Sequence, residues 1–297
     1  MSNVSISTNN LTIGYLSPSL HGKSEEASIV QSDLSFSLYE GEMVCMLGPN
    51  GCGKSTLLRT LAGLQPAISG EFSLTAQRSN SETVSHLTAQ RSKSIALVLT
   101  ERMSLESTTV HDVVAMGRYP YTSFLGGLTD EDERIIAQSL HQVGFDSLSG
   151  TESAGLSAQR SVSDNGLTAQ RSVEALASTM FNAHSDGEKQ RILIAKALAQ
   201  QTPIILLDEP TAHLDLPHRI LILRLLRQLA HEQGKTILIS THELDLALAL
   251  SDRILLMSPK KGIQLDTAAN LRKADAFTSA FNMDIFNIYQ QLTNENI

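Results

Sequence analysis

Residues 48–55 limit most strongly what this chain can fold into. They read Gly-Pro-Asn-Gly-Cys-Gly-Lys-Ser, the pattern of a phosphate-binding P-loop. Glycines let the backbone turn its N–H groups around an anion, the lysine reaches the β- and γ-phosphates, and the serine hydroxyl can bind Mg²⁺. An apolar run at 43–47 precedes the loop, and a helical pattern over 55–62 follows it and ends at Gly63. The sequence therefore predicts a buried parallel strand, a phosphate-binding loop and a helix whose N-terminus faces the phosphates.

Composition limits the compartment and the partners of the chain. Its 297 residues suffice for one large domain or two small ones, and 31 acidic residues against 23 basic ones give a net charge of −8. This charge argues against a nucleic-acid partner. The two cysteines, Cys45 in the predicted core strand and Cys52 in the P-loop, suggest no disulfide and favour the cytosol. Residues 1–10 are polar, and no apolar run approaches the roughly 18 residues that a membrane helix needs. Any role at a membrane would thus need a partner.

Periodic patterns predict an α/β fold with a mostly parallel sheet. Short apolar runs at 204–207 and 236–240 are typical of buried strands, and residues 219–231 between them form an amphipathic helical pattern. Strands and helices alternate around the P-loop and again from residue 190 onward, as expected of crossover connections. The middle of the chain, roughly 101–183, is predicted to be helical. Capping boxes are predicted at 109–112 and 129–132, with a helix stop at Gly144.

A repeated hexapeptide crosses this plan without a fixed period. Leu-Thr-Ala-Gln-Arg-Ser occurs at 74–79, 87–92 and 167–172, and a variant with serine at its second position occurs at 156–161. Unequal spacing excludes a solenoid. The polar surroundings favour two tolerated loop insertions, at about 73–92 and 150–175, and a docking tag for a partner is the alternative. The second copy precedes the apolar run at 95–99, so part of it is expected to join the fold.

Acidic residues end the strand predicted at 204–207. A buried strand end carrying Asp208 and Glu209 is costly unless a cation meets it, and beside a P-loop that cation is Mg²⁺. We therefore predict Asp208 as a metal ligand that acts through water or from the outer coordination sphere, and Glu209 as the base that orients and deprotonates the attacking water. A strand that simply ends in a solvated acidic pair is the alternative.

Two further sites follow from their positions on predicted elements. Ser185, Asp186, Gly187 and Glu188 open a predicted helix, where they either cap the helix or form a second anion-binding terminus. His242 follows the strand at 236–240, and ligands of parallel sheets bind at the carboxyl ends of the strands. We therefore predict a functional role for His242.

Taken together, these residues closely resemble the ATP-binding subunits of ABC transporters. The resemblance implies ATP and Mg²⁺ as ligands and assigns a role to each motif. Tyr15 would stack on adenine. ATP would be bound by the P-loop residues Gly48, Pro49, Asn50, Gly51, Cys52, Gly53, Lys54, Ser55 and Thr56. Residues 184–188 would be the signature, 204–209 the Walker B motif with catalytic Glu209, 212–215 the D-loop with Asp215, and His242 the catalytic switch histidine. Ser55 and Asp208 would hold the Mg²⁺.

The same resemblance implies an architecture and an assembly. Residues 1–265 would form the ATP-binding domain, with a nucleotide-binding core, a small antiparallel β subdomain and an inserted helical subdomain at about 101–183. Residues 266–297 would form a helical tail. Members of the family form a dimer that holds each ATP between one P-loop and the signature of the other subunit, here Ser185, Asp186, Gly187 and Glu188.

Two stretches resemble one subfamily, the ATPases of iron–siderophore, haem and cobalamin importers. One is Met116 to Tyr121 followed by Leu128 to Asp132, and the other is Pro210 to Leu216. This implies a separate membrane permease, an extracytoplasmic substrate-binding protein, a homodimer of ATPase subunits, and a place on the cytoplasmic face of the cell membrane. Another metal importer or an exporter ATPase of the family is the nearest alternative.

Departures from the family pattern affect two places. His184 stands where the signature usually has leucine, and Asp186 and Glu188 replace the usual glycine and glutamine. Thr100 and Glu101 occupy the place of the Q-loop glutamine, so either Thr100 contacts Mg²⁺ through its hydroxyl or Glu101 substitutes.

Two alternatives outside transport do not match this sequence. Soluble ABC ATPases that act on ribosomes or DNA commonly carry two ATPase units or a long coiled coil, whereas this sequence has one P-loop and no sustained heptad pattern. A degenerate regulatory module would not be expected to keep Lys54, Asp208, Glu209 and His242.

Overall fold

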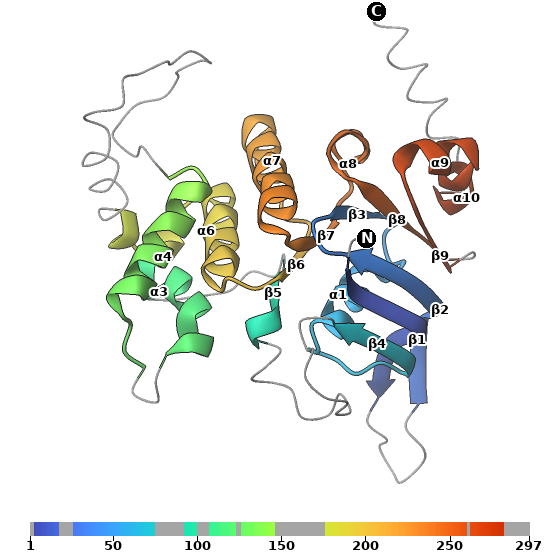
Figure 1. The fold of residues 1–297 in the computed structure, drawn as a ribbon, viewed down its shortest axis with the longest axis horizontal. Helices are drawn as coiled ribbons and strands as arrows, with labels where there is room; N and C mark the ends of the chain where they lie inside the picture. The colour runs from blue at the N-terminus through green and yellow to red at the C-terminus, as the bar shows by residue number, and fades with distance from the viewer. Residues whose placement is uncertain are drawn as a thin grey trace, which may run out of the picture. The chain divides into compact units, whose positions relative to one another are not determined.

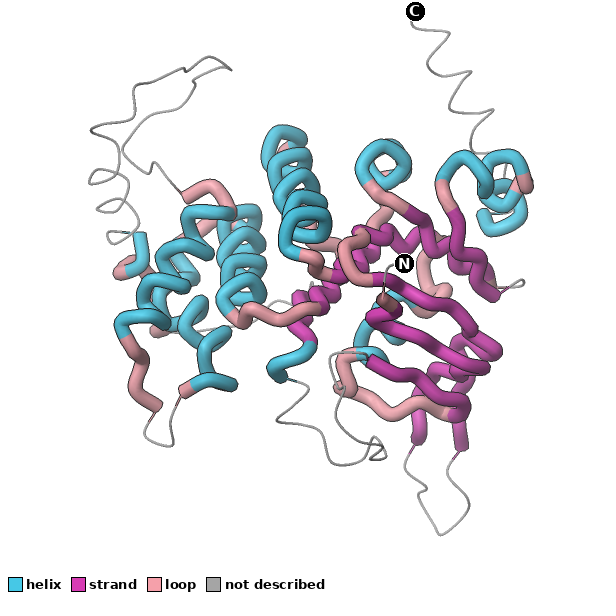
Figure 2. The backbone as a smooth tube through the Cα atoms, in the orientation of Figure 1, coloured by secondary structure: helices cyan, strands magenta, loops and turns pink. Residues whose placement is uncertain are grey.

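The chain divides into two units, one rich in strands and one helical (Figure 1, Figure 2). The computed structural model describes residues 3–17, 26–74, 92–99, 107–122, 126–145, 176–259 and 262–281. Unit 1 consists of Met1–Thr100, Thr202–Ala212 and Leu226–Ile297, and unit 2 of Glu101–Gln201 and His213–Leu225.

A small antiparallel sheet opens unit 1. Its strands are β1 (Val4–Ser17), β2 (Glu26–Tyr39) and β4 (Ser69–Leu74), in the order β2-β1-β4. Leu74 ends β4 in a buried position, so the first residue of the first hexapeptide belongs to the fold. The remainder of that copy, the copies at 156–161 and 167–172, and the second copy except Ser92 lie outside the described residues.

The larger sheet of unit 1 carries the P-loop and has the order β5-β6-β7-β3-β8-β9. The strands are β3 (Met43–Leu47), β5 (Ile95–Val98), β6 (Ile204–Asp208), β7 (Thr236–Ser240), β8 (Arg253–Ser258) and β9 (Gly262–Asp266). The first five strands of the order are parallel and β9 is antiparallel to β8. Every residue of β3, β6 and β7 is buried, which explains why these strands read as continuous apolar runs.

Helices of unit 1 follow the strands of the larger sheet. They are α1 (Lys54–Leu61), α8 (Leu244–Leu250), α9 (Ala268–Lys273) and α10 (Ala276–Phe281), and the last part of α7 (Leu216–Gln233). The helix predicted at 219–231 is thus longer than the apolar pattern indicated. The core of unit 1 joins both sheets, since Ile6 and Leu34 of the small sheet, Leu57 of α1 and Leu206 of β6 belong to one buried apolar cluster.

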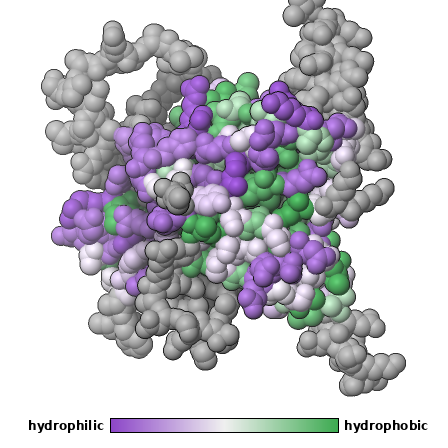
Figure 3. Space-filling view, turned by 45° about the vertical axis from the view of Figure 1, so that its right-hand side comes forward, coloured by the Kyte–Doolittle hydropathy of each residue, from purple (hydrophilic) through white to green (hydrophobic). Residues whose placement is uncertain are grey.

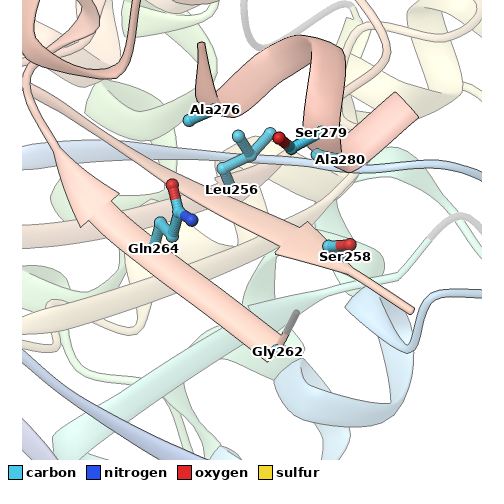
Figure 4. A pocket seen from close by; sticks show the side chains of 7 residues that line it. All are labelled: Leu256, Ser258, Gly262, Gln264, Ala276, Ser279 and Ala280. Atoms are coloured by element: carbon cyan, nitrogen blue, oxygen red, sulfur yellow. The ribbon is translucent and has the colours of Figure 1, made fainter. Parts of the chain in front are cut away.

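A very small cavity lies in unit 1 between β8, β9 and α10 (Figure 4). It is lined by Leu256, Ser258, Gly262, Gln264, Ala276, Ser279 and Ala280. Its volume of about 10 Å³ is at the lower limit for one water molecule, so it offers no room for a substrate.

Unit 2 is built from helical elements. They are α3 (Val110–Ala115), η3 (Met116–Tyr121), α4 (Asp130–Gln142), η4 (Phe181–Ala183), α6 (Asp186–Ala199) and the first part of α7. The predicted capping boxes are confirmed, because Thr109 and Asp112 cap each other at α3 and Thr129 and Asp132 do so at α4. Gly144 takes a φ of 87° just beyond α4, which few other residues tolerate.

The two parts of the stretch that resembles the importer ATPases meet inside unit 2. Arg118 Nε of η3 lies 2.8 Å from Asp132 Oδ1 of α4, and both side chains are buried. The same guanidinium donates to the Ala199 carbonyl oxygen (2.8 Å) at the end of α6 and lies over the ring of Tyr121, 4.2 Å from its centroid. A Cβ at position 117 would lie 2.3 Å from the Lys196 carbonyl oxygen, so Gly117 permits this close approach. The stretch is therefore one connected contact between η3, α4 and α6.

Removing Arg118 should destabilise this contact strongly. Arg118→Met keeps the apolar stem of the side chain but leaves the buried Asp132 carboxylate without its cation, which costs about 3–5 kcal/mol. Denaturant unfolding of the purified chain measures the loss. Arg134→Met is the matched control, because Arg134 and Glu131 form an exposed pair and should contribute below about 1 kcal/mol. Equal losses from both variants would contradict a special role for the buried pair.

The effect should also depend on pH. Hydrogen bonds from the Thr129 backbone and hydroxyl, together with Arg118, lower the pKa of Asp132 to about 2. Because the folded-state pKa is depressed, the stabilisation is present above the ordinary value of 3.8 and is lost as pH falls through about 2. The stability difference between wild type and Arg118→Met should therefore shrink in strong acid.

The surface shows apolar residues as separate patches among polar ones on the face drawn in Figure 3. Among the described residues, no helix combines the length and apolar character needed to cross a membrane.

The predicted fold class is confirmed: a mostly parallel sheet, a small antiparallel sheet and an inserted helical part. The predicted domain limits stay predictions, and residues 282–297 of the predicted tail lie outside the described residues.

Candidate functional site

The P-loop connects β3 to α1 and is shaped by its glycines. A Cβ at position 48 would lie 2.5 Å from the Met257 carbonyl oxygen, so this position has no room for a side chain. Gly53, the residue before α1, has a φ of 101°, a conformation that side chains disfavour. The loop therefore adopts a backbone that other residues would not allow, and it leads directly into the N-terminus of a helix, where anions bind.

Lys54 lies folded over this loop. Its Nζ donates to the carbonyl oxygens of Gly48 (2.9 Å) and Pro49 (3.3 Å), and the side chain is only 6% exposed. The two carbonyl oxygens hold the ammonium group inside the loop. A phosphate bound in the loop would therefore meet a positive charge that is already in place.

Gln31 supports the P-loop and was not identified from the sequence. This buried residue of β2 donates through Nε2 to the carbonyl oxygens of Cys52 (3.1 Å) and Ser258 (3.1 Å). It thereby ties the loop to the end of β8. The partners lie 21 and 227 residues away, so only its burial in an otherwise amphipathic strand could have drawn attention to it.

Tyr15 lies next to the start of α1, as its predicted role requires. Its hydroxyl is 3.1 Å from Thr56 Oγ1, and half of the residue is exposed. Ser55 is exposed as well. An aromatic ring at the surface beside the P-loop helix is available for stacking on a base.

Asp208, Glu209 and His242 come together at the carboxyl ends of β6 and β7. The parallel register pairs Asp208 with Ser240, and Ser240 Oγ donates to Asp208 Oδ1 at 2.5 Å. The Glu209 N–H donates to both the carbonyl oxygen (3.0 Å) and the hydroxyl (3.1 Å) of Ser240. Ser240, a residue that the sequence analysis did not single out, thus fixes both acidic residues. Its place directly before Thr241 and His242 at a strand end was the available signal.

The backbone of Glu209 takes an uncommon conformation. Its φ of 48° lies in the left-handed region, which few residues other than glycine adopt. The two hydrogen bonds to Ser240 hold it there. His242 Nε2 contacts Glu209 Oε1, and both side chains are partly exposed. Strained backbone of this kind concentrates at functional sites, and here it aims a carboxylate at a histidine on the adjacent strand end.

The same region suits a divalent cation. Asp208 is 6% exposed and provides carboxylate oxygen, and Ser55 provides a hydroxyl at the first turn of α1, which packs against β6. Oxygen donors of this kind match Mg²⁺, which takes few protein ligands and completes its shell with phosphate and water. The described residues contain no group of three or more acidic, histidine or cysteine side chains that could hold a metal. Thr100 and Glu101 lie outside the described residues.

Neither cysteine has the environment of a reactive thiol. Burial raises the pKa of Cys45 to about 12. Burial also raises the pKa of Cys52, although the charge of Lys54 opposes this. The thiolate is the reactive form, so these shifts argue against redox chemistry at either cysteine.

The signature segment lies in unit 2 at the N-terminus of α6. Ser185 and Glu188 form a reciprocal capping box, with Ser185 Oγ 2.8 Å from Glu188 Oε2 and Glu188 N 3.3 Å from Ser185 Oγ. An open hollow at this helix end is lined by Ser185, Asp186, Gly187, Glu188, Arg191, His213, Leu214, Asp215 and His218. The signature and the predicted D-loop aspartate therefore share one hollow.

Asp215 of this hollow is fixed by the start of α7. Its Oδ1 accepts from the His218 N–H (3.1 Å) and lies 2.5 Å from His218 Nδ1. These two hydrogen bonds lower the pKa of Asp215. The residue is thus an ionised, oriented carboxylate.

Comparison with known proteins identifies relatives of the whole chain. The family model described as ABC transporter matches residues 31–212. The iron(3+)-hydroxamate import ATP-binding protein FhuC of Bacillus subtilis is 32% identical over 293 residues, which cover 99% of this chain and 93% of that protein. The hemin import ATP-binding protein HmuV of Thermobifida fusca is 34% identical over 265 residues, 89% of this chain and 79% of that protein.

A solved structure shares the fold. The dimeric structure of MJ0796, a bacterial ABC transporter cassette, has a TM-score of 0.66 and 26% sequence identity, and the match covers 88% of this chain and 98% of that one.

Proposed function

The chain belongs to the ABC transporter family, and from this premise we propose that it is the ATP-hydrolysing subunit of an importer. The cargo is a ferric siderophore, haem or cobalamin. Relatives named for import of iron-hydroxamate and hemin support this class. The observation that carries the activity is the cluster at the ends of β6 and β7, where Ser240 orients Asp208 and Glu209 and His242 contacts Glu209.

The proposed reaction is attack of water on the γ-phosphate of ATP. Lys54 and the P-loop N–H groups bind the phosphates, while Ser55 and Asp208 would hold Mg²⁺, with Thr100 as a further candidate. The metal would supply positive charge to the phosphate oxygens. Glu209 orients the water and accepts its proton as the new P–O bond forms and the bond to the β–γ bridging oxygen breaks. His242 holds the Glu209 carboxylate in place.

Assembly extends the site beyond one chain. We infer a homodimer in which Ser185, Asp186, Gly187 and Glu188, with Asp215, contact the ATP bound to the other subunit. The dimeric cassette among the structural relatives supports this arrangement. The movement of the dimer on ATP binding and hydrolysis would be transmitted to a membrane permease. A substrate-binding protein would deliver the cargo on the outer side, and this chain would lie on the cytoplasmic face of the cell membrane.

Copurification from detergent-solubilised native membranes tests the proposal. The tagged full chain should bring down a polytopic permease in comparable amounts, and deleting the gene should abolish uptake of one of the three labelled cargo classes. ATP-dependent recovery of ribosomes or DNA repair proteins without a permease would contradict the transport function. Retained uptake of all three cargo classes would contradict the proposed substrate class while leaving the ATPase activity standing.

A further inference from the structure

His184 and Glu188, two departures from the usual signature pattern, lie beside each other in unit 2. His184 Nδ1 is 3.7 Å from Glu188 Oε2, and its side chain is only 11% exposed. Glu188 Oε2 also accepts from the backbone N–H (2.9 Å) and hydroxyl (2.8 Å) of Ser185. The same carboxylate oxygen therefore faces a histidine ring and accepts a hydrogen bond from the hydroxyl of the signature serine.

The hydrogen bonds assign one proton on the ring. Thr179 Oγ1 donates its single proton to the Leu176 carbonyl oxygen (2.6 Å), so it can only accept from His184 Nε2 at 2.7 Å. His184 thus carries a proton on Nε2. In the neutral ring, Nδ1 then turns a lone pair toward Glu188, whereas in the imidazolium it turns an N–H toward the carboxylate. Only in the charged form do both ring nitrogens, Nε2 and Nδ1, point an N–H toward an acceptor.

The charge of Glu188 matters because of what Ser185 is proposed to meet. Burial alone would raise the pKa of Glu188, but hydrogen bonds from Ser185 and the charges of His184 and Arg191 hold it below its ordinary value. Glu188 is therefore an anion at the helix end where a triphosphate would arrive. The other charged or titratable groups described at this end are Asp186, paired with Lys189, Arg191, which also interacts with Asp215, and the two histidines of the hollow, His213 and His218.

We propose that His184 is a positioning residue for the Ser185 hydroxyl. Its ring offsets the charge of Glu188, and so allows Ser185 to turn its proton from Glu188 to an anionic phosphate. This rests on the proposed function, in which Ser185 contacts the ATP of the other subunit. With leucine and glutamine, the residues of the usual signature pattern, neither charge would be present and no compensation would be needed. In this chain the two departures belong together.

A double-mutant cycle tests the compensation. In His184→Leu the charge of Glu188 is no longer offset. This variant should therefore have a kcat/KM for ATP about tenfold lower than the wild type, mainly because KM rises. In the Glu188→Gln background, whatever the activity of that single variant, the added His184→Leu change should cost less than about threefold. A loss of about tenfold from His184→Leu in both backgrounds would overturn the proposal. Melting temperatures of all four proteins separate misfolding from mispositioning.

The pH profile supplies a readout that a packing role would not move. His184→Gln can still donate to Thr179 but stays neutral, so it mimics the uncharged ring. The ratio of wild-type to variant kcat/KM should fall as pH rises, because an imidazole side chain can lose a proton and an amide cannot. His111→Gln is the control, since His111 pairs with Glu133 elsewhere in unit 2 (2.8 Å). Its ratio should stay flat.

Outcomes for the two proposals differ. A ratio for His184→Gln that does not change with pH would overturn the positioning role while ATP hydrolysis persists. Absence of ATP hydrolysis in the wild-type chain would instead refute the proposed function.

Discussion

ATP hydrolysis should fall by about 10²–10⁴ in Glu209→Gln, while ATP still binds. The amide keeps the size of the side chain and an oxygen that can face His242 Nε2, but it cannot take a proton from water. The backbone at residue 209 should remain in its left-handed conformation, because the hydrogen bonds to Ser240 involve the main-chain N–H. Binding without turnover should let an ATP-bound dimer accumulate. Phosphate release and size-exclusion chromatography with ATP measure the two effects.

The control must change a glutamate without touching this cluster. Glu232 near the end of α7 accepts a hydrogen bond from Gln228 (2.8 Å) and is exposed, so Glu232→Gln should hydrolyse ATP at the wild-type rate. His242→Gln shows how much of the effect passes through the histidine. Near-normal hydrolysis by Glu209→Gln would remove Glu209 from its assigned role, whatever His242 does.

Local signals in the sequence were sufficient for most elements of the fold. The strands at 43–47, 204–207 and 236–240 could be predicted because strands buried on both faces are apolar throughout. The starts of α3 and α4 could be predicted because a capping box lies within four residues. Strand order could not be predicted, since β3 lies between β7 and β8, which follow it by nearly two hundred residues.

Some residues of the candidate site could likewise be predicted from the sequence, and others could not. The P-loop and the acidic pair Asp208 and Glu209 are contiguous motifs, so their spacing alone carries chemical meaning. Gln31 and Ser240 act through partners distant in sequence, and a single glutamine or serine in a strand carries no local signal. The start of α7 was predicted too late because the helix begins at Leu216, ahead of the apolar pattern, where the preceding Asp215 accepts from the His218 N–H.

The departures at the signature show what local reasoning leaves open. The sequence marked His184 and Glu188 as separate exceptions, four residues apart. Their shared environment depends on Thr179 and on the direction of its hydroxyl proton, which spacing does not specify. Because His184 and Glu188 are in contact, the two departures can be tested as a pair.

ATP binding should collapse in Lys54→Ala. Nζ lies in the loop on the carbonyl oxygens of Gly48 and Pro49, and in the complex it would meet the β- and γ-phosphates. Each lost charge-assisted hydrogen bond costs about 1.5–3 kcal/mol, so two of them weaken ATP binding by roughly 10²–10⁴. Titration calorimetry with ATP and Mg²⁺ measures the affinity, and ATPase activity should disappear with it.

A second lysine of unit 1 provides the matched control. Lys235 Nζ also donates to a backbone carbonyl oxygen, that of Thr202 (2.7 Å), but it precedes β7 and so lies at the opposite edge of the sheet from the P-loop. Lys235→Ala removes the same charge and a similar contact, yet ligands of such sheets bind at the carboxyl edge. Its affinity for ATP should therefore equal that of the wild type. Unchanged ATP binding by a folded Lys54→Ala protein would show that residues 48–55 do not bind the phosphates, and the roles of Ser55, Asp208 and Glu209 would lose their basis with it.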